Sequence, residues 1–290
     1  MTLVEANGVE LCVEAHGDPA DPALLLVHGH GAQLIAWHDD LVQAFVDLGC
    51  YVVRFDNRDV GLSTHLGHLG VPDVVAIASG DRSTVPYLVD DMADDAAALC
   101  EALSLDGVHV LGVSMGGMIA QSFAIRHPDA TRSLTSIMSS PDPLRVGTPS
   151  AATQAMMLEP PATTREEVVA RSLESWRRTG SPALGLDEAW IADHVGRQFD
   201  RSFDPAGTAR QFAAIVASPD RRPGLATVTA PTLVVHGAID PLVTLEGGEA
   251  TAEAVPGARL VVIDQMGHDL PRSVWPQVLG EIGALVADAG

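Results

Sequence analysis

The chain has 290 residues, of which 47% are hydrophobic and 19% charged, so it is long enough to bury a large core and its composition excludes intrinsic disorder. Its formal net charge of −21 disfavours binding to the phosphate backbone of nucleic acids. The cysteines Cys12, Cys50 and Cys100 lie far apart, as is typical of reduced thiols in a cytoplasmic protein. The first residues lack the basic and apolar regions of a signal peptide, and glycines interrupt the uncharged run 108–125, so we expect no membrane partner.

Strand and helix patterns alternate over the first half of the chain. Apolar strand patterns cover residues 9–15, 23–27, 51–56, 108–113 and 133–138. Helical spacing of apolar residues follows three of these strands, over 41–48, 92–103 and 115–127. The segment 59–86 is rich in glycine and aspartate and has no regular pattern, as in a long functional loop. The alternation predicts a mostly parallel sheet with helices on both faces.

A different pattern occupies residues 141–225, where no buried strand is predicted. Thr163 and Glu166 are spaced as a capping box at the start of one predicted helix, and two more helices are predicted around Trp190 and Phe212. We interpret this segment as a helical cap over the sheet. Its larger apolar side chains are candidates for a substrate pocket, with packing inside the cap as the alternative: Met156, Met157, Trp176, Trp190 and Phe199.

Strand patterns return at 231–237 and 259–263, and helical spacing over 278–285 ends the chain. The sequence therefore predicts an α/β core domain interrupted by the cap before its last two strands. The predicted boundaries are 1–140 and 226–290 for the core and 141–225 for the cap.

The strongest motif is Gly112-Val113-Ser114-Met115-Gly116, which lies between a predicted strand and a predicted helix. This context is typical of a nucleophile elbow, in which a strained turn presents a serine hydroxyl and only glycine fits beside it. A glycine-containing turn in some other α/β protein is the alternative. We predict that Ser114 is the nucleophile.

Serine needs a base to accept its proton and a carboxylate to orient that base. Asp240 and His268 follow the last two predicted strands. Because the carboxyl ends of parallel strands meet at one edge of a sheet, we expect both side chains to lie near Ser114. Asp142, which follows an earlier strand, is an alternative to Asp240 as the acid, although it lies between two prolines.

The predicted oxyanion hole consists of the backbone N–H groups of Met115 and His30. Gly29 would let the backbone approach the substrate closely, so Gly29, His30 and Met115 are the predicted substrate-binding residues. We expect His28 to be structural.

No metal or cofactor is predicted. The polar residues His65, His68, Asp90 and Asp91 lack metal-ligand spacing, and no dinucleotide or phosphate loop occurs in the sequence. Another polar group is expected to brace the loops around the elbow through hydrogen bonds: Asp56, Arg58 and Ser63.

Several stretches resemble the α/β-hydrolase superfamily and, within it, the aclacinomycin methylesterase group of small-molecule esterases. They are residues 17–27, residues 54–61, the elbow, and Met266-Gly267-His268 followed by Leu270-Pro271. The order of serine, aspartate and histidine along the chain is also that of the superfamily. One departure is His28-Gly29-His30-Gly31, where that group often has Met-Gly, so the His30 side chain would narrow the acyl pocket or add a polar contact. The resemblance implies a cytoplasmic monomer or homodimer without a cofactor.

These residues together predict a serine carboxylic-ester hydrolase that forms an acyl-enzyme on a small-molecule ester. The same triad could instead hydrolyse lactones or carbon–carbon bonds, or carry out perhydrolysis. A ligand receptor on this fold is a third hypothesis, which the presence of all three triad residues disfavours. Epoxide-hydrolase and dehalogenase chemistry would need aspartate in place of Ser114.

Overall fold

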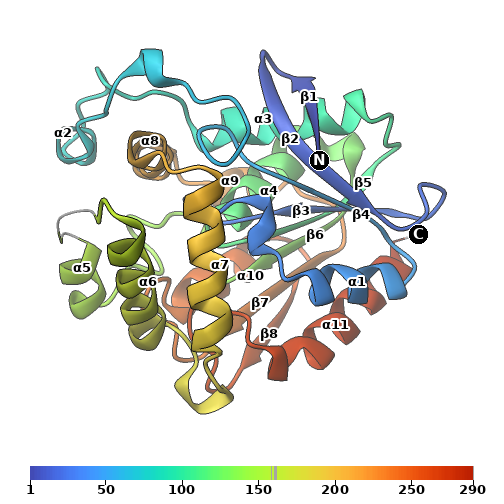
Figure 1. Cartoon of the computed structure of the whole chain (residues 1–290). Coiled ribbons are helices and arrows are strands. Elements are labelled where there is room, and N and C mark those ends of the chain that lie inside the picture. Colours follow the sequence, from blue (N-terminus) through green and yellow to red (C-terminus); the bar gives the residue numbers. More distant parts are fainter. Residues whose placement is uncertain (158, 160–161, 290) are drawn as a thin grey trace.

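The computed structural model describes residues 1–157, 159 and 162–289. Over these residues eight strands form one sheet in the order β1-β2-β4-β3-β5-β6-β7-β8, antiparallel at β1, β2 and β4 and parallel from β4 to β8 (Figure 1). The prediction of a mostly parallel α/β sheet is confirmed. The strands are β1 (Thr2–Ala6), β2 (Val9–His16), β3 (Ala23–Val27), β4 (Tyr51–Phe55), β5 (Val108–Val113), β6 (Thr131–Ile137), β7 (Thr232–Gly237) and β8 (Arg259–Ile263).

Strand β1 was not predicted, although the sequence contained a signal for it. Asn7 and Gly8 join β1 to β2 with φ angles of 50° and 77°. An Asn-Gly pair with positive φ at both positions is the favoured two-residue hairpin turn.

Helices cover both faces of the sheet. α1 (Asp39–Asp47) and α11 (Trp275–Asp288) pack on one face, and α3 (Val89–Ala102), α4 (Met115–Arg126) and α10 (Leu245–Ala254) on the other (Figure 1). Strand β3 shows why its apolar run is continuous: Leu24 and Leu26 face the α1 side and Leu25 faces the α3 side. Helix α10 was not predicted, because its glycines lower the helix propensity of the segment. Gly248 allows the helix to pack closely on β7, since a Cβ at this position would lie 2.5 Å from Nδ1 of His236.

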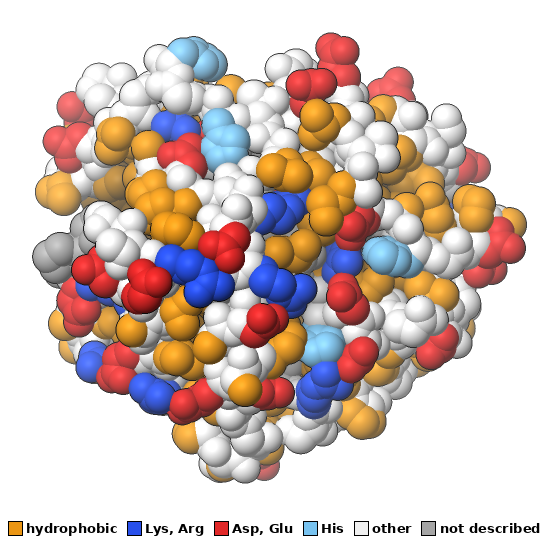
Figure 2. Space-filling model, in the orientation of Figure 1, with side chains coloured by type: hydrophobic (Ala, Val, Ile, Leu, Met, Phe, Trp, Pro, Cys, Tyr) orange, Lys and Arg blue, Asp and Glu red, His pale blue; other side chains and the backbone are white. Residues whose placement is uncertain are grey.

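Five α-helices lie between β6 and β7 in the described residues, at one end of the sheet (Figure 1). Helices α6 and α7 lie side by side, and Figure 2 shows acidic and basic side chains intermingled over this region. The segment falls within the predicted cap, whose boundaries stay a prediction. The helices are α5 (Ala151–Met157), α6 (Arg165–Thr179), α7 (Glu188–Arg201), α8 (Pro205–Ala217) and α9 (Arg222–Leu225).

Two predictions near the cap need correction. The capping box lies one residue later than predicted: Thr164 is the N-cap of α6, and its hydroxyl and the Glu167 carboxylate each accept a backbone N–H. The segment 59–86 is also not wholly irregular. It contains α2 (Val74–Ala78), whose Ile77 packs against apolar residues of α8.

The predicted bracing of the loops is confirmed for Asp56 and Ser63, whereas the Arg58 side chain pairs with helix α3. Asp56, at the end of β4, accepts hydrogen bonds from Leu34 N (2.6 Å) and Leu62 N (2.9 Å). Ser63 Oγ donates to the Asp56 carbonyl at 2.6 Å. Arg58 forms an ion pair with buried Asp95, with Nη2 2.5 Å from Oδ1.

None of the described helices has both the length and the apolar character needed to cross a bilayer.

Candidate active site

Ser114 lies in the turn between β5 and α4 with φ 56° and ψ −122°, a conformation that is rare for a residue other than glycine. The neighbouring glycines permit close backbone approach. A Cβ on Gly112 would lie 2.0 Å from the Gly116 oxygen, and a Cβ on Gly116 would lie 2.1 Å from the Val27 oxygen. The strained serine is therefore held in place by packing that accepts only hydrogen at both flanking positions.

The structure brings Ser114, His268 and Asp240 together. Nε2 of His268 lies 3.0 Å from Oγ of Ser114, and Nδ1 lies 2.7 Å from Oδ2 of Asp240. The other carboxylate oxygen, Oδ1, accepts the N–H groups of Leu242 (2.8 Å) and Val243 (2.9 Å). Because a carboxylate accepts from Nδ1–H, Nε2 carries the lone pair and can accept the serine proton.

The alternative acid, Asp142, is not brought to the histidine. Its Oδ2 forms an ion pair with Nη1 of Arg145 at 2.9 Å, and its backbone N–H donates to Ser140 Oγ. The side chain lies in the chain segment that leads from β6 into the cap helices.

The backbone N–H groups of Met115 and His30 have no hydrogen-bond partner within the described part of the chain. Gly29 lies directly against the serine, since a Cβ there would be 3.2 Å from Cβ of Ser114. The His30 side chain also contacts α8, where its Nε2–H donates to the Thr208 carbonyl at 2.8 Å. Burial lowers the pKa of His30.

His28 holds the loop that carries these groups. Its Nδ1 accepts the Gly29 N–H at 2.7 Å, and its carbonyl accepts from the Asn57 amide at 3.2 Å. The ring packs edge-on against Trp37 with 5.0 Å between centroids. Burial lowers the pKa of His28 to about 3, so the ring is neutral at physiological pH.

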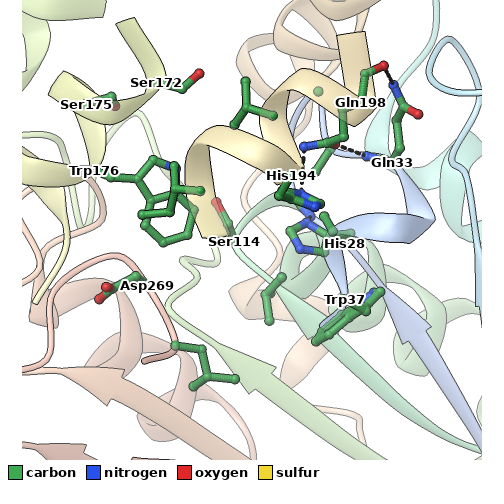
Figure 3. Close-up of a pocket in the computed structure, with 18 of the residues that line it drawn as sticks. His28, Gln33, Trp37, Ser114, Ser172, Ser175, Trp176, His194, Gln198 and Asp269 are labelled. Atoms are coloured by element: carbon green, nitrogen blue, oxygen red, sulfur yellow. Dashed lines mark hydrogen bonds between the residues drawn. The ribbon is translucent and has the colours of Figure 1, made fainter. Parts of the chain in front are cut away.

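A cavity of about 840 Å³ lies over Ser114, between the sheet edge and the cap. Figure 3 shows Ser114 between Trp176 on one side and the neighbouring His28 and His194 on the other. Met156 and Met157, which were candidates for this pocket, do not line it. All four tryptophans of the chain do, together with two phenylalanines: Trp37, Trp176, Trp190, Trp275, Phe199 and Phe203.

The polar lining of the cavity was missed by sequence reasoning. His194 of α7 is buried, and its ring stacks on Trp190 at 4.5 Å between centroids. Its Nε2 accepts from the Gln198 side-chain amide at 2.8 Å, and burial lowers its pKa to about 4. Three further residues that line the cavity had no motif to reveal them: Ser172, Ser175 and Asp269.

One group of described residues, Asp59, His65 and Asp204, brings three possible metal-ligand atoms within 4.8 Å of one another. Both carboxylates already pair with the guanidinium of Arg210. Its Nη2 lies 2.6 Å from Oδ1 of Asp59 and 3.4 Å from Oδ2 of Asp204, and Nδ1 of His65 lies 2.7 Å from Oδ2 of Asp204. We therefore assign this group to a polar network between loop and cap and not to a metal.

Comparisons of the sequence and of the fold with those of known proteins both find hydrolytic enzymes. The chain is 29% identical to rhodomycin D methylesterase DauP of Streptomyces sp. (strain C5), over 97% of this chain and 96% of that protein. Two solved structures match over 99% of this chain: the enol-lactonase from Burkholderia xenovorans LB400 (TM-score 0.73, 22% identity, 99% of that chain) and a thermophilic esterase from Thermogutta terrifontis (TM-score 0.72, 24% identity, 98% of that chain).

The similarity to a methylesterase confirms the resemblance seen in the sequence, and the expectation of a hydrolytic enzyme of this fold is confirmed with it. The model of the family described as alpha/beta hydrolase fold matches residues 22–271, most of the chain. The chain therefore belongs to the α/β-hydrolase fold family.

Proposed function

We propose that this protein is a serine ester hydrolase in which Ser114, His268 and Asp240 act as the catalytic triad. The observation that carries the proposal is the continuous chain of hydrogen bonds from Ser114 Oγ to His268 (3.0 Å) and from His268 to Asp240 (2.7 Å). The unpaired N–H groups of Met115 and His30 support the second requirement of such an enzyme, an oxyanion hole.

In the proposed reaction, Oγ of Ser114 attacks the ester carbonyl while His268 takes its proton. The carbonyl oxygen becomes an oxyanion and accepts hydrogen bonds from the N–H groups of Met115 and His30, beside Gly29. His268 then donates its proton to the leaving alcohol, and an acyl-enzyme remains on Ser114. A water molecule, deprotonated by the same histidine, releases the acid and restores the serine.

The pocket supports a substrate with a large aromatic or apolar part. Its volume of about 840 Å³ is far more than a methyl or ethyl ester of a short acid would fill. Tryptophan rings provide broad apolar faces for planar groups. Since the relative DauP is named a methylesterase, we propose a bulky ester with a small alcohol as the substrate class.

We further propose that the enzyme works in the cytoplasm as a monomer or homodimer, without cofactor or nucleic acid. The charge of −21 supports the last point, because a polyanion would be repelled. Sedimentation of the purified protein measures the oligomeric state directly.

The test is hydrolysis of p-nitrophenyl and methyl esters, with lactones included, by the wild type and by Ser114→Ala. We expect ester hydrolysis by the wild type, loss of at least about 10³-fold in kcat for Ser114→Ala, and labelling by a fluorophosphonate probe at Ser114 alone. Ser83→Ala, at an exposed serine outside the site, is the matched control. Equal labelling of the wild type and Ser114→Ala, or turnover of lactones with none of linear esters, would refute the proposal.

A further inference from the structure

The segment that carries His268 is attached to the cap by its own main chain. The His268 N–H donates to the Thr179 carbonyl, the last residue of α6, at 2.6 Å. One residue earlier, the Gly267 N–H donates to Ser181 Oγ at 2.8 Å. The Ser181 hydroxyl in turn donates to Oδ1 of Asp269 in a short hydrogen bond. Residues 267–269 and 179–181 thus form one hydrogen-bonded clamp.

The two backbones of this clamp are in direct contact. A Cβ on Gly267 would lie 2.2 Å from the Gly180 oxygen and 2.4 Å from the Thr179 oxygen. A Cβ on Gly180 would lie 3.0 Å from Oδ2 of Asp269. Ser181 is only 1% exposed and Asp269 only 4%. The two segments of the clamp are therefore tightly packed, and a displacement of one segment displaces the other.

On either side of the clamp the histidine segment is attached to the core. The Met266 carbonyl accepts the Ile239 N–H at 3.1 Å, and the Leu270 carbonyl accepts from Nε1 of Trp275 at 2.9 Å. Between these anchors, the hydrogen bonds of the main chain go to the cap. The position of the His268 main chain consequently depends on where the C-terminal end of α6 lies.

Helix α6 is also a wall of the substrate cavity. One of its faces lines the cavity, with Ser172, Ser175, Trp176 and Thr179. Its opposite face is exposed and charged, and Glu174 there forms ion pairs with its neighbours Arg177 and Arg178. Figure 3 places Ser172, Ser175 and Trp176 along this wall and Asp269 near it. A substrate that packs against this face presses on the same helix that holds the histidine segment.

We propose that Ser181 and Asp269 are positioning residues that couple helix α6 to His268, so that a substrate filling the cavity against α6 holds the histidine in place for proton transfer. The coupling rests on the proposed function. It predicts that bulky substrates gain in kcat and not only in KM, because misplacement of a catalytic group mainly lowers the rate of the chemical step.

The kinetic test compares p-nitrophenyl acetate with p-nitrophenyl 2-naphthoate, whose acyl group is large enough to reach α6. We expect Ser181→Ala to lower kcat for the naphthoate by about tenfold, with little change in KM and little change in kcat for the acetate. Ser181→Thr, which keeps the hydroxyl, should restore the kcat ratio. An equal fall for both esters, or no fall for either, would show that the clamp is only structural support.

A double-mutant cycle tests whether the two residues act as one unit. Asp269→Ala should lower kcat for the naphthoate by about the same factor as Ser181→Ala, and the double variant Ser181→Ala/Asp269→Ala should be no worse than Ser181→Ala alone. Glu174→Ala, on the outer face of α6, is the matched control and should leave both kcat values unchanged. Additive losses at Ser181 and Asp269 would contradict the proposal.

Amide hydrogen exchange separates this inference from the proposed function, because it needs no turnover. Binding of 2-naphthoic acid should slow exchange in residues 264–271 of the wild type but not of Ser181→Ala. If the wild type hydrolyses no ester yet shows this protection, the proposed function fails and the coupling stands. If it hydrolyses esters without such protection, the coupling fails alone.

Discussion

Arg201 of the cap helix α7 forms an ion pair with Asp56 at the end of β4, with Nη2 2.7 Å from Oδ2. The Asp56 side chain is completely buried and also accepts N–H groups from Leu34 and Leu62. Gly61 makes room for it, since a Cβ there would lie 2.2 Å from Oδ2. One carboxylate thus joins the sheet, the loops beside the elbow and the cap.

Removal of the Arg201 charge should destabilise the protein strongly. Arg201→Met leaves a buried carboxylate without its cation, which costs on the order of 3–5 kcal/mol in the free energy of unfolding. The matched control is Arg165→Met, which breaks the exposed pair with Asp200 and should cost less than about 1 kcal/mol. Urea denaturation monitored by tryptophan fluorescence measures both. Similar losses in the two variants would show that burial of the pair is unimportant.

The choice between the two candidate acids can be tested by isosteric substitution. Asp240→Asn should lower kcat by about 10⁴-fold, because the amide no longer holds the histidine in the required tautomer. Asp142→Asn should stay within about threefold of the wild type, since Asp142 pairs with Arg145 and not with His268. Steady-state kinetics on one p-nitrophenyl ester decides the question, and a comparable loss in Asp142→Asn would contradict our assignment.

Gly116, two residues after the nucleophile Ser114, should not tolerate a methyl group. Gly116→Ala places a Cβ 2.1 Å from the Val27 oxygen, so β3 and α4 must separate. We expect poor folding or loss of activity, with a destabilisation on the order of 3 kcal/mol. Gly280→Ala is the control, because Gly280 is an exposed position of α11 with nothing within 4 Å of the new Cβ. This substitution should stabilise the helix by up to about 1 kcal/mol. Thermal unfolding of both variants gives the comparison.

The buried histidines predict a loss of stability in weak acid. Burial lowers the pKa of His109 from its ordinary 6.5 to about 4, and His28 and His194 are shifted in the same direction. Between pH 6.5 and 4 the unfolded chain therefore binds protons that the folded chain does not, so stability falls as the pH is lowered through this range. His109 alone should contribute about 2 kcal/mol between pH 7 and pH 5.

Denaturation in urea at pH 7 and pH 5 checks this sign. In the wild type, Nδ1 of His109 lies 2.8 Å from Oγ of Ser133. His109→Asn removes the titrating ring and keeps a polar group near this hydroxyl, so it should reduce the pH dependence of the free energy of unfolding. The surface variant Ser83→Ala should retain it. Greater stability at pH 5 than at pH 7 would exclude the proposed linkage.

Much of the fold could be predicted because its signals are local. The run from Val108 through Gly116 predicts strand, turn and helix in that order, since periodicity and glycine spacing depend only on neighbours in the chain. The same local logic went wrong at α10, where glycines required for close packing resemble a loop. It also placed the capping box one residue early, at Thr163, because adjacent threonines and glutamates offer two equivalent registers.

The sequence by itself determined the strand–turn–helix around Ser114 and placed Asp240 and His268 after the last two strands, where parallel strands end at one edge. Only the tertiary structure decided that Asp240 and not Asp142 lies against His268, that the four tryptophans share one cavity, and that Ser181 reaches Asp269. The physical reason is that sequence patterns report local interactions, whereas these features depend on long-range contacts. A sequence pattern records which side of an element is buried, whereas hydrogen-bond partners and cavity walls depend on distances between elements that are far apart in the chain.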